Sequence, residues 1–309
     1  MKILHWQRVG HQTHQVGESP FWHPDEHRLY WLDNEADQLW RSAGGHQRPE
    51  SWAMPSSPGC IAPARSGGLV IALRDGIYRA RQWGGPLQRL APARHDPRST
   101  RFNDGKADPQ GRFWAGTIYE PRDRPDAALF CLDARPGRGP AASLRRVLGG
   151  VTNANGLAFA PDSRTLYWAD TTRHLVRAWD FDAATGTPAN ERVFHRFGAK
   201  PPGWRAGQAG YGGRPDGAAI DAQGNYWCAL FEGGRLLQLS PTGQVLQELP
   251  LPVRCPTMPC FGGPDLRTLF LTTASHKRPA DELRRLPLSG HVLWTRVDVP
   301  GRPVDFFVD

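Results

Sequence analysis

GLAFAPDSRTLYWAD, at residues 156–170, has the pattern of two neighbouring β-strands joined by a tight turn. Its two ends are apolar and aromatic, and a Pro-Asp turn separates them, as an antiparallel pair of strands requires. Looser copies of this pattern recur along the chain, at residues 19–33, 60–73, 105–117, 217–230 and 260–273. The sequence is therefore built largely from six copies of one unit.

The spacing of the copies indicates a β-propeller. Successive turns mostly lie near the interval of about 40 to 50 residues that is typical of a propeller blade, and two larger gaps indicate loop insertions. One unit is too small to bury its own apolar face, so the units should stack radially into a ring. We therefore expect residues 1–309 to form a single all-β domain, a six-bladed β-propeller. The alternative is a β-sandwich or two-sheet barrel, which would not require a six-fold recurrence.

Three other features of the chain lead to structural expectations. The terminal segments KILHWQ (2–7) and VDFFVD (304–309) both have strand character, and we expect them to complete one blade together. The segment 198–213 lacks strand character and is predicted to be a loop or lid at one end of the ring. Five cysteines without C-x-x-C spacing indicate reduced, structural thiols, with a Cys255–Cys260 bridge as a minor alternative.

Composition and charge exclude several classes of function. The net charge of +8 comes mainly from dispersed arginines, and no basic block indicates a nucleic-acid partner. No apolar run approaches the roughly 18 residues that span a membrane, so we expect a cytoplasmic protein without a membrane partner. The pairs His11/His14 and His23/His27 have metal-ligand spacing only on a helix, and we expect these histidines at the surface.

Polar side chains recur just before the inner strand of four units: Glu18, Asn103 with Asp104, Asn155, and Asp216. Because the innermost strands of a propeller line its channel, these side chains should converge on the axis. Carboxylate and amide oxygens suit calcium, magnesium or manganese, and zinc remains an option. Any single Asn-Gly or Asp-Gly could simply be a turn. Their recurrence at one blade position instead predicts a central site for one divalent metal ion.

The succession of these motifs resembles the family that includes regucalcin (senescence marker protein), bacterial gluconolactonases and luciferin-regenerating enzyme. The resemblance is carried by GESPFW (17–22), RFNDGKADPQGRFWAGT (101–117), NANGLAFAPDSRTLYWAD (153–170) and RPDGAAIDAQGNYW (214–227). It implies two sets of site residues: the metal ligands Glu18, Asn155 and Asp216, and the lactone contacts Arg101, Asn103 and Glu120. Around Glu120, the stretch TIYEPRD departs from the acidic pattern usual in the family.

These residues are compatible with ester hydrolysis at a metal ion. A bound cation would polarise the lactone carbonyl and stabilise the oxyanion, and Asp216 could accept a proton from the attacking water. We therefore predict a metal-dependent lactonase that converts a sugar lactone, an aldonolactone, to its aldonic acid, with Arg101 and Asn103 orienting ring hydroxyls.

Two other functions are weighed against this prediction. The first is a metal-assisted esterase acting on aryl esters or organophosphates, which would share the mechanism and differ in the pocket wall. The second is a non-enzymatic binding propeller, which is disfavoured because gathered carboxylates are costly unless a cation compensates them. The chain contains no G-x-S-x-G elbow and no phosphate-binding loop, so serine hydrolases and nucleotide-binding enzymes have no support.

Overall fold

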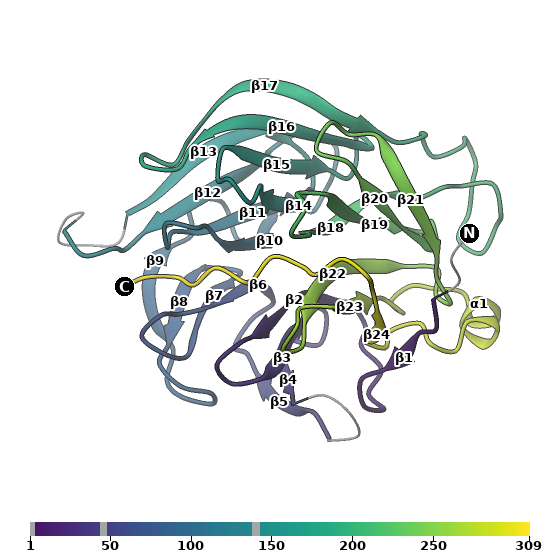
Figure 1. The fold of residues 1–309 in the computed structure, drawn as a ribbon, viewed down its shortest axis with the longest axis horizontal. Coiled ribbons are helices and arrows are strands. Elements are labelled where there is room, and N and C mark those ends of the chain that lie inside the picture. Colours follow the sequence, from purple (N-terminus) through teal and green to yellow (C-terminus); the bar gives the residue numbers. More distant parts are fainter. Residues whose placement is uncertain (1–3, 44–47, 138–142) are drawn as a thin grey trace.

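The computed structural model describes residues 4–43, 48–137 and 143–309. They form six four-stranded antiparallel sheets around a central axis, which confirms the six-bladed propeller (Figure 1). From the innermost strand outward, the first five blades consist of β2 (Gly17–His23), β3 (Arg28–Asp33), β4 (Gln38–Ser42) and β5 (Glu50–Ala53); β6 (Pro58–Pro63), β7 (Leu69–Leu73), β8 (Gly76–Ala80) and β9 (Gln88–Pro92); β10 (Thr100–Ala107), β11 (Phe113–Tyr119), β12 (Ala127–Asp133) and β13 (Ser143–Val151); β14 (Ala154–Phe159), β15 (Thr165–Asp170), β16 (Leu175–Asp182) and β17 (Thr187–Arg196); and β18 (Arg214–Ile220), β19 (Tyr226–Phe231), β20 (Arg235–Leu239) and β21 (Val245–Pro250).

The sixth blade joins the two ends of the ring. It consists of β22 (Pro256–Gly262), β23 (Thr268–Thr273), β24 (Leu293–Arg296) and, on the outside, the N-terminal strand β1 (Gln7–Arg8). Gln7 pairs with Trp294. The N-terminal strand β1 therefore completes a blade whose other three strands come from residues 256–296. Lys2 and Ile3 of the predicted N-terminal strand lie outside the described residues.

The expectation that VDFFVD joins this blade is wrong. The C-terminal segment instead crosses one face of the ring, in yellow in Figure 1. The backbone N–H of Phe307 donates to the carbonyl of Pro63 in the second blade (2.8 Å), and that of Val308 donates to Gly111 in the third (2.9 Å). Phe307 is fully buried between these blades. With β1 already on the outer edge of β24, Phe306 and Phe307 of the segment are instead buried against this face of the ring.

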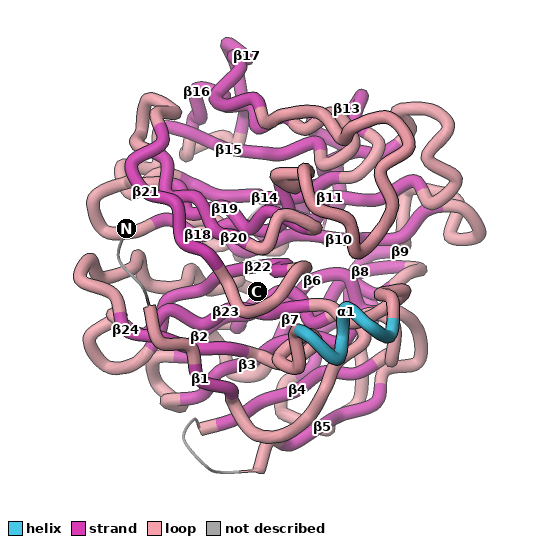
Figure 2. The backbone as a smooth tube through the Cα atoms, turned by 90° about the vertical axis from the view of Figure 1, so that its right-hand side faces the viewer, coloured by secondary structure: helices cyan, strands magenta, loops and turns pink. Residues whose placement is uncertain are grey.

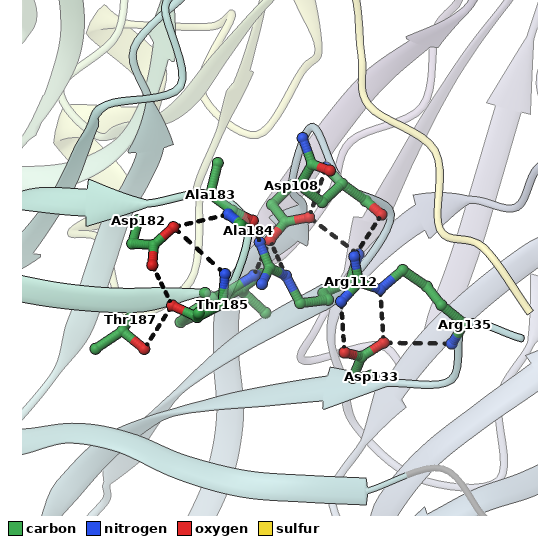
Figure 3. A network of polar contacts seen from close by, with 12 residues as sticks. Asp108, Arg112, Asp133, Arg135, Asp182, Ala183, Ala184, Thr185 and Thr187 are labelled. Atoms are coloured by element: carbon green, nitrogen blue, oxygen red, sulfur yellow. Dashed lines mark hydrogen bonds and ion pairs between the residues drawn. The ribbon is translucent and has the colours of Figure 1, made fainter. Parts of the chain in front are cut away.

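The apolar core lies mainly between neighbouring blades. The largest fully buried side chains, Trp31, Trp114 and Trp168, come from the second strands of their blades. Asp108 accepts hydrogen bonds from Trp114 Nε1 (2.8 Å) and Arg112 Nε (2.6 Å). Arg112 also donates to the carbonyl of Ala183, which links the third blade to the fourth (Figure 3). Buried polar contacts of this kind fix the angle at which adjacent blades pack.

Two smaller expectations about loops and thiols are confirmed. Residues 198–213 contain no strand. The helix α1 (Ala280–Arg285) lies at the right-hand edge of the ring in Figure 1 and faces the viewer in Figure 2. All five cysteines are buried and free, so Cys255 and Cys260 form no bridge.

The surface placement of the histidines is wrong for His14 and His23, which are buried. His14 packs edge-on against Trp31 and Trp40, and its Nδ1 lies 3.6 Å from Asp33. An imidazole surrounded by indole rings is a core residue, and the sequence contained no periodic signal for this environment.

Candidate active site

Every innermost strand contains a β-bulge at a corresponding level of the channel. The pairing with the second strand shifts between Glu18 and Phe21, Pro58 and Cys60, Phe102 and Gly105, Asn155 and Ala158, Pro215 and Ala218, and Pro256 and Met258. A bulge leaves residues unpaired, bends the strand and re-aims its side chains. Each predicted site residue of the first, third, fourth and fifth blades lies within or beside a bulge, except for Glu120. The bulges of the other two blades contain Gly59 and Thr257, which have no carboxylate.

The bulges of the first, third, fourth and fifth blades border a cavity of about 600 Å³ at one end of the channel. All six residues predicted as metal ligands or substrate contacts line it: Glu18, Arg101, Asn103, Glu120, Asn155 and Asp216. Asp104 does not line the cavity, because its carboxylate turns into the protein and accepts a hydrogen bond from the Leu157 N–H (2.8 Å). The repeat therefore correctly predicted that residues up to about 200 positions apart in the chain lie together. Asp104, which was also expected to face the axis, points away from the cavity.

Glu18 is half-buried and Asp216 is buried, and neither carboxylate makes an ion pair with any described residue. Burial raises the pKa of Glu18 well above its ordinary value, and the negative charges of Asp216 and Asp104 raise it further. Burial also raises the pKa of Asp216, to about 8, against the opposing effect of the Arg214 charge. Two such groups in one low-dielectric site disfavour each other's ionisation. The site therefore favours either protons or a cation.

A chain of hydrogen bonds holds the side chain of Asn155 in place. Its Nδ2 donates to Thr171 Oγ1 (2.8 Å), and this hydroxyl donates in turn to the carbonyl of Pro215, next to Asp216. Asn103 Nδ2 donates to Asn155 Oδ1 (2.9 Å). The side chain predicted to contact substrate thus also orients a predicted metal ligand. Thr171 is a positioning residue that the sequence alone did not reveal.

Arg101 and Glu120 lie together on the wall of the cavity. Arg101 Nη1 donates to Asn103 Oδ1 (3.0 Å), and its Nε lies 3.5 Å from Glu120 Oε1. Both oxygens of Glu120 accept hydrogen bonds from Arg74, at 2.9 and 3.0 Å. The bond from Arg74 lowers the pKa of Glu120, so the carboxylate is ionised and held in one orientation.

A group of basic residues on the cavity wall was not singled out from the sequence. Arg122, Arg214, Lys277 and Arg278 line the same cavity, together with Glu232. Glu232 Oε2 lies 3.1 Å from Arg214 Nη1 and 2.7 Å from Nζ of Lys200, which belongs to the 198–213 loop. Glu232 Oε1 lies 3.1 Å from Arg278 Nη1. The sequence signals were present, since Arg122 belongs to TIYEPRD and Arg214 precedes the Asp216 motif. Their shared location depends on the ring closure.

A second, smaller cavity of about 90 Å³ lies at the opposite end of the channel. It is lined mostly by apolar side chains and closed by residues 302–305 of the C-terminal segment. Lys106 reaches into it and donates to the carbonyl of Ala218 (3.0 Å). Apart from the Arg302–Asp305 ion pair, it has few of the convergent polar groups that a binding site needs.

The open cavity has a donor set that fits a hard divalent cation. Within the described ranges, no three His, Cys, Asp or Glu side chains converge as a ligand cluster, so two carboxylates would need neutral oxygens beside them. Asn155 Oδ1 offers such an oxygen. The half-buried Glu18 and the buried Asp216 have the charge that a cation would neutralise. These oxygen donors suit calcium, magnesium or manganese better than a soft metal.

Residues 16–275 match the profile described as SMP-30/gluconolactonase/LRE-like region. The chain belongs to this family. It is 43% identical over 293 residues to 6-deoxy-6-sulfogluconolactonase of Pseudomonas putida, with 95% of each chain covered. It is 32% identical over 299 residues to regucalcin of Xenopus laevis, covering 94% of each.

Solved structures agree with the fold. A calcium-binding protein, regucalcin, from Agrobacterium tumefaciens superposes with a TM-score of 0.86 at 24% identity, covering 97% of this chain and 96% of that one. A luciferin-regenerating enzyme superposes with a TM-score of 0.83 at 25% identity, covering 96% of each. Among the described residues, no helix is long and apolar enough to cross a membrane.

Proposed function

We propose that this family member is a metal-dependent sugar lactonase that hydrolyses an aldonolactone to the aldonic acid. The observation that carries the proposal is the pair of carboxylates, the half-buried Glu18 and the buried Asp216, which line an open polar cavity without an ion-pair partner among the described residues. Gathering such groups away from water is unfavourable unless a cation compensates them. The identity to 6-deoxy-6-sulfogluconolactonase supports a lactone of the aldonic type as substrate.

In this proposal, Glu18, Asn155 and Asp216 hold the divalent ion. The ion supplies Lewis-acid polarisation of the lactone carbonyl and stabilises the negative charge that develops on its oxygen. Asn103 and Thr171 keep the Asn155 side chain oriented toward the channel through the hydrogen bonds described above.

The remaining residues orient substrate and move the proton. Asp216 accepts a proton from the attacking water, whose oxygen bonds to the carbonyl carbon. The bond from that carbon to the ring oxygen then breaks, and the proton passes to the departing alkoxide. Arg101 and Asn103 donate hydrogen bonds to ring hydroxyls, and Glu120, fixed by Arg74, accepts one. Buried recognition of hydroxyls discriminates strongly against analogues that lack them.

A substrate panel tests this function. Proton release would be followed in a pH-stat for glucono-1,5-lactone, an unsubstituted δ-lactone, an aryl acetate and an organophosphate triester, after subtraction of spontaneous hydrolysis. We expect the highest kcat/KM for the aldonolactone. Faster turnover of the aryl acetate or the triester would support the esterase alternative, and no turnover of any substrate would support a binding propeller.

Two matched variants connect the activity with the site. Asp216→Asn removes the proposed ligand and base, and we expect it to abolish hydrolysis. Asp25→Asn removes an exposed carboxylate from the turn between β2 and β3, and we expect wild-type rates. Equal activity of both variants would contradict the placement of the chemistry at Asp216.

A further inference from the structure

The cavity is lined by both acidic and basic side chains. The carboxylates of Glu18 and Asp216 lie on innermost strands, as does Asn155. The wall formed by the fifth and sixth blades and by the 120–126 loop contributes the cations Arg122, Arg214, Lys277 and Arg278. A site for a neutral sugar lactone needs only the first of these two groups of side chains.

Existing ion pairs do not neutralise this basic wall. Glu232 has Lys200, Arg214 and Arg278 around it, and Arg278 is also paired with Glu282 (2.7 Å). Two other acidic groups of the lining have partners of their own. Glu120 is bound by Arg74, and Glu35 lies 3.9 Å from His276. When protons or a cation balance Glu18 and Asp216, a surplus of positive charge faces the cavity, because the remaining lining carboxylates are fewer than the lining cations. These carboxylates are Glu35, Glu120 and Glu232, and the cations are Arg101, Arg122, Arg214, Lys277 and Arg278.

Arg122 carries the clearest part of this surplus. In the described part of the chain, its guanidinium makes no ion pair and no hydrogen bond, although it lines the cavity. Arg122 is exposed to the solvent of the cavity mouth. Partial desolvation lowers its pKa and the nearby positive charge of Arg214 lowers it further, against the opposing charges of Asp216, Glu120 and Glu35. The backbone of Arg122 is left-handed, with φ of 60°. Such a conformation is costly for a residue other than glycine and is found where the surrounding structure imposes it.

We propose that Arg122 and Arg214 form a subsite for an anionic substituent on the substrate, such as a sulfonate or phosphate at the end of the sugar remote from the lactone carbonyl. This inference rests on the proposed lactonase function and narrows its substrate class. Planar guanidinium groups bind such oxyanions through paired, charge-assisted hydrogen bonds. Lys277, also unpaired among the described residues, adds to the positive field at the rim.

The competing role for Arg122 is at the reaction centre itself, where it would contact the carboxylate of any aldonic acid product. The two roles differ in their substrate dependence. An anion subsite matters only when the substrate carries the anion, whereas contact with the product carboxylate matters equally for every aldonolactone.

The test compares Arg122→Gln with wild type on two substrates, glucono-1,5-lactone and the same lactone with a sulfonate or a phosphate at C6. We expect wild type to prefer the anionic lactone, and Arg122→Gln to reduce the ratio of the two kcat/KM values on the order of 10- to 100-fold, as expected for a lost hydrogen bond to a charged group. Arg122→Lys should restore part of the ratio. The control is Arg124→Gln on the same loop, because Arg124 is exposed, pairs with Asp126 and does not line the cavity. Comparison of the two anions tells which oxyanion the site prefers.

A binding measurement separates the subsite from the lactonase function. Calorimetry with glucose 6-phosphate and glucose, which contain no lactone to hydrolyse, should show tighter binding of the phosphate in wild type and loss of that preference in Arg122→Gln. A binding preference without hydrolysis of any lactone would refute the proposed function and leave the subsite standing. Hydrolysis with an unchanged substrate ratio, or equal losses on both lactones, would overturn the subsite and leave the lactonase standing.

Discussion

Replacement of Asp216 by asparagine should stabilise the metal-free protein at alkaline pH while removing its response to cations. The pKa of Asp216 is raised in the folded state from 3.8 to about 8. The folded protein therefore holds a proton that the unfolded chain releases, and stability falls as the pH rises from about 4 to about 8. A difference of about four pKa units corresponds to a ceiling on the order of 5 kcal/mol. Asparagine has the same shape and cannot ionise, so the variant should escape this loss.

Urea unfolding in the presence of a chelator measures this effect at pH 5 and pH 8. We expect Asp216→Asn to exceed wild type by roughly 2–4 kcal/mol in free energy of unfolding at pH 8, and by less at pH 5, because at pH 5 the wild-type carboxyl is still protonated in the folded state. Asp25→Asn, at the surface, should match wild type at both pH values.

The advantage of the variant at pH 8 should largely disappear when calcium or manganese is added. A cation at about 100 times its Kd stabilises the folded state by about 2.7 kcal/mol, and we expect this gain in wild type and not in Asp216→Asn. If the variant were less stable than wild type in chelator at both pH values, burial of the Asp216 carboxylate would not destabilise the fold. If the variant gained as much stability from the cation as wild type does, Asp216 would not be a ligand.

Three other substitutions test the supporting structure. Asn103→Ala should lower kcat/KM on a sugar lactone about 10-fold, in line with one lost hydrogen bond to a polar group, and should also weaken cation binding because its amide orients Asn155; calorimetry showing unchanged cation affinity would restrict Asn103 to substrate contact. Phe307→Ala should cost about 3–5 kcal/mol in urea unfolding, since the side chain is fully buried against one face of the ring; an unchanged midpoint would show that the C-terminal segment does not hold the blades. Gly156→Ala should reduce stability and activity more than Gly150→Ala, because both have positive φ but only at Gly156 would the new Cβ lie 2.2 Å from a tyrosine hydroxyl; equal losses in the two variants would assign the effect to backbone strain alone.

The blades could be predicted because each repeat is specified locally, by an apolar strand, a turn and an aromatic strand. The way in which the two ends of the chain close the ring could not be predicted. Two terminal segments had the same strand character, and only packing decides that β1 pairs with β24 while Phe307 is buried on another face. His14 was misplaced for a similar reason, since its burial depends on contacts with Trp31 and Trp40, which follow it by 17 and 26 residues.

The site residues that lie at the repeated position on the inner strands could be predicted from the sequence. The site residues that lie on loops between strands could not. Asn155 and Asp216 lie at bulges of inner strands, so their convergence follows from the ring. Glu120 lies outside any bulge. Its hydrogen bonds from Arg74, 46 residues away, could not be predicted from any sequence pattern. The approach of Arg122 to Arg214 likewise comes from two different blades. That the carboxylates Glu18 and Asp216 share one cavity with Arg122 and Arg214 therefore became apparent only from the structure.

The central claim is that this propeller hydrolyses an aldonolactone with one divalent ion in its channel. The most direct measurement removes all metal with a chelator, then titrates calcium, magnesium, manganese or zinc back while recording bound metal per chain and kcat/KM on glucono-1,5-lactone. The account predicts no enzymatic hydrolysis in the stripped protein and full activity when one ion is bound, with Glu18→Gln binding none. Full hydrolysis at zero bound metal would contradict it.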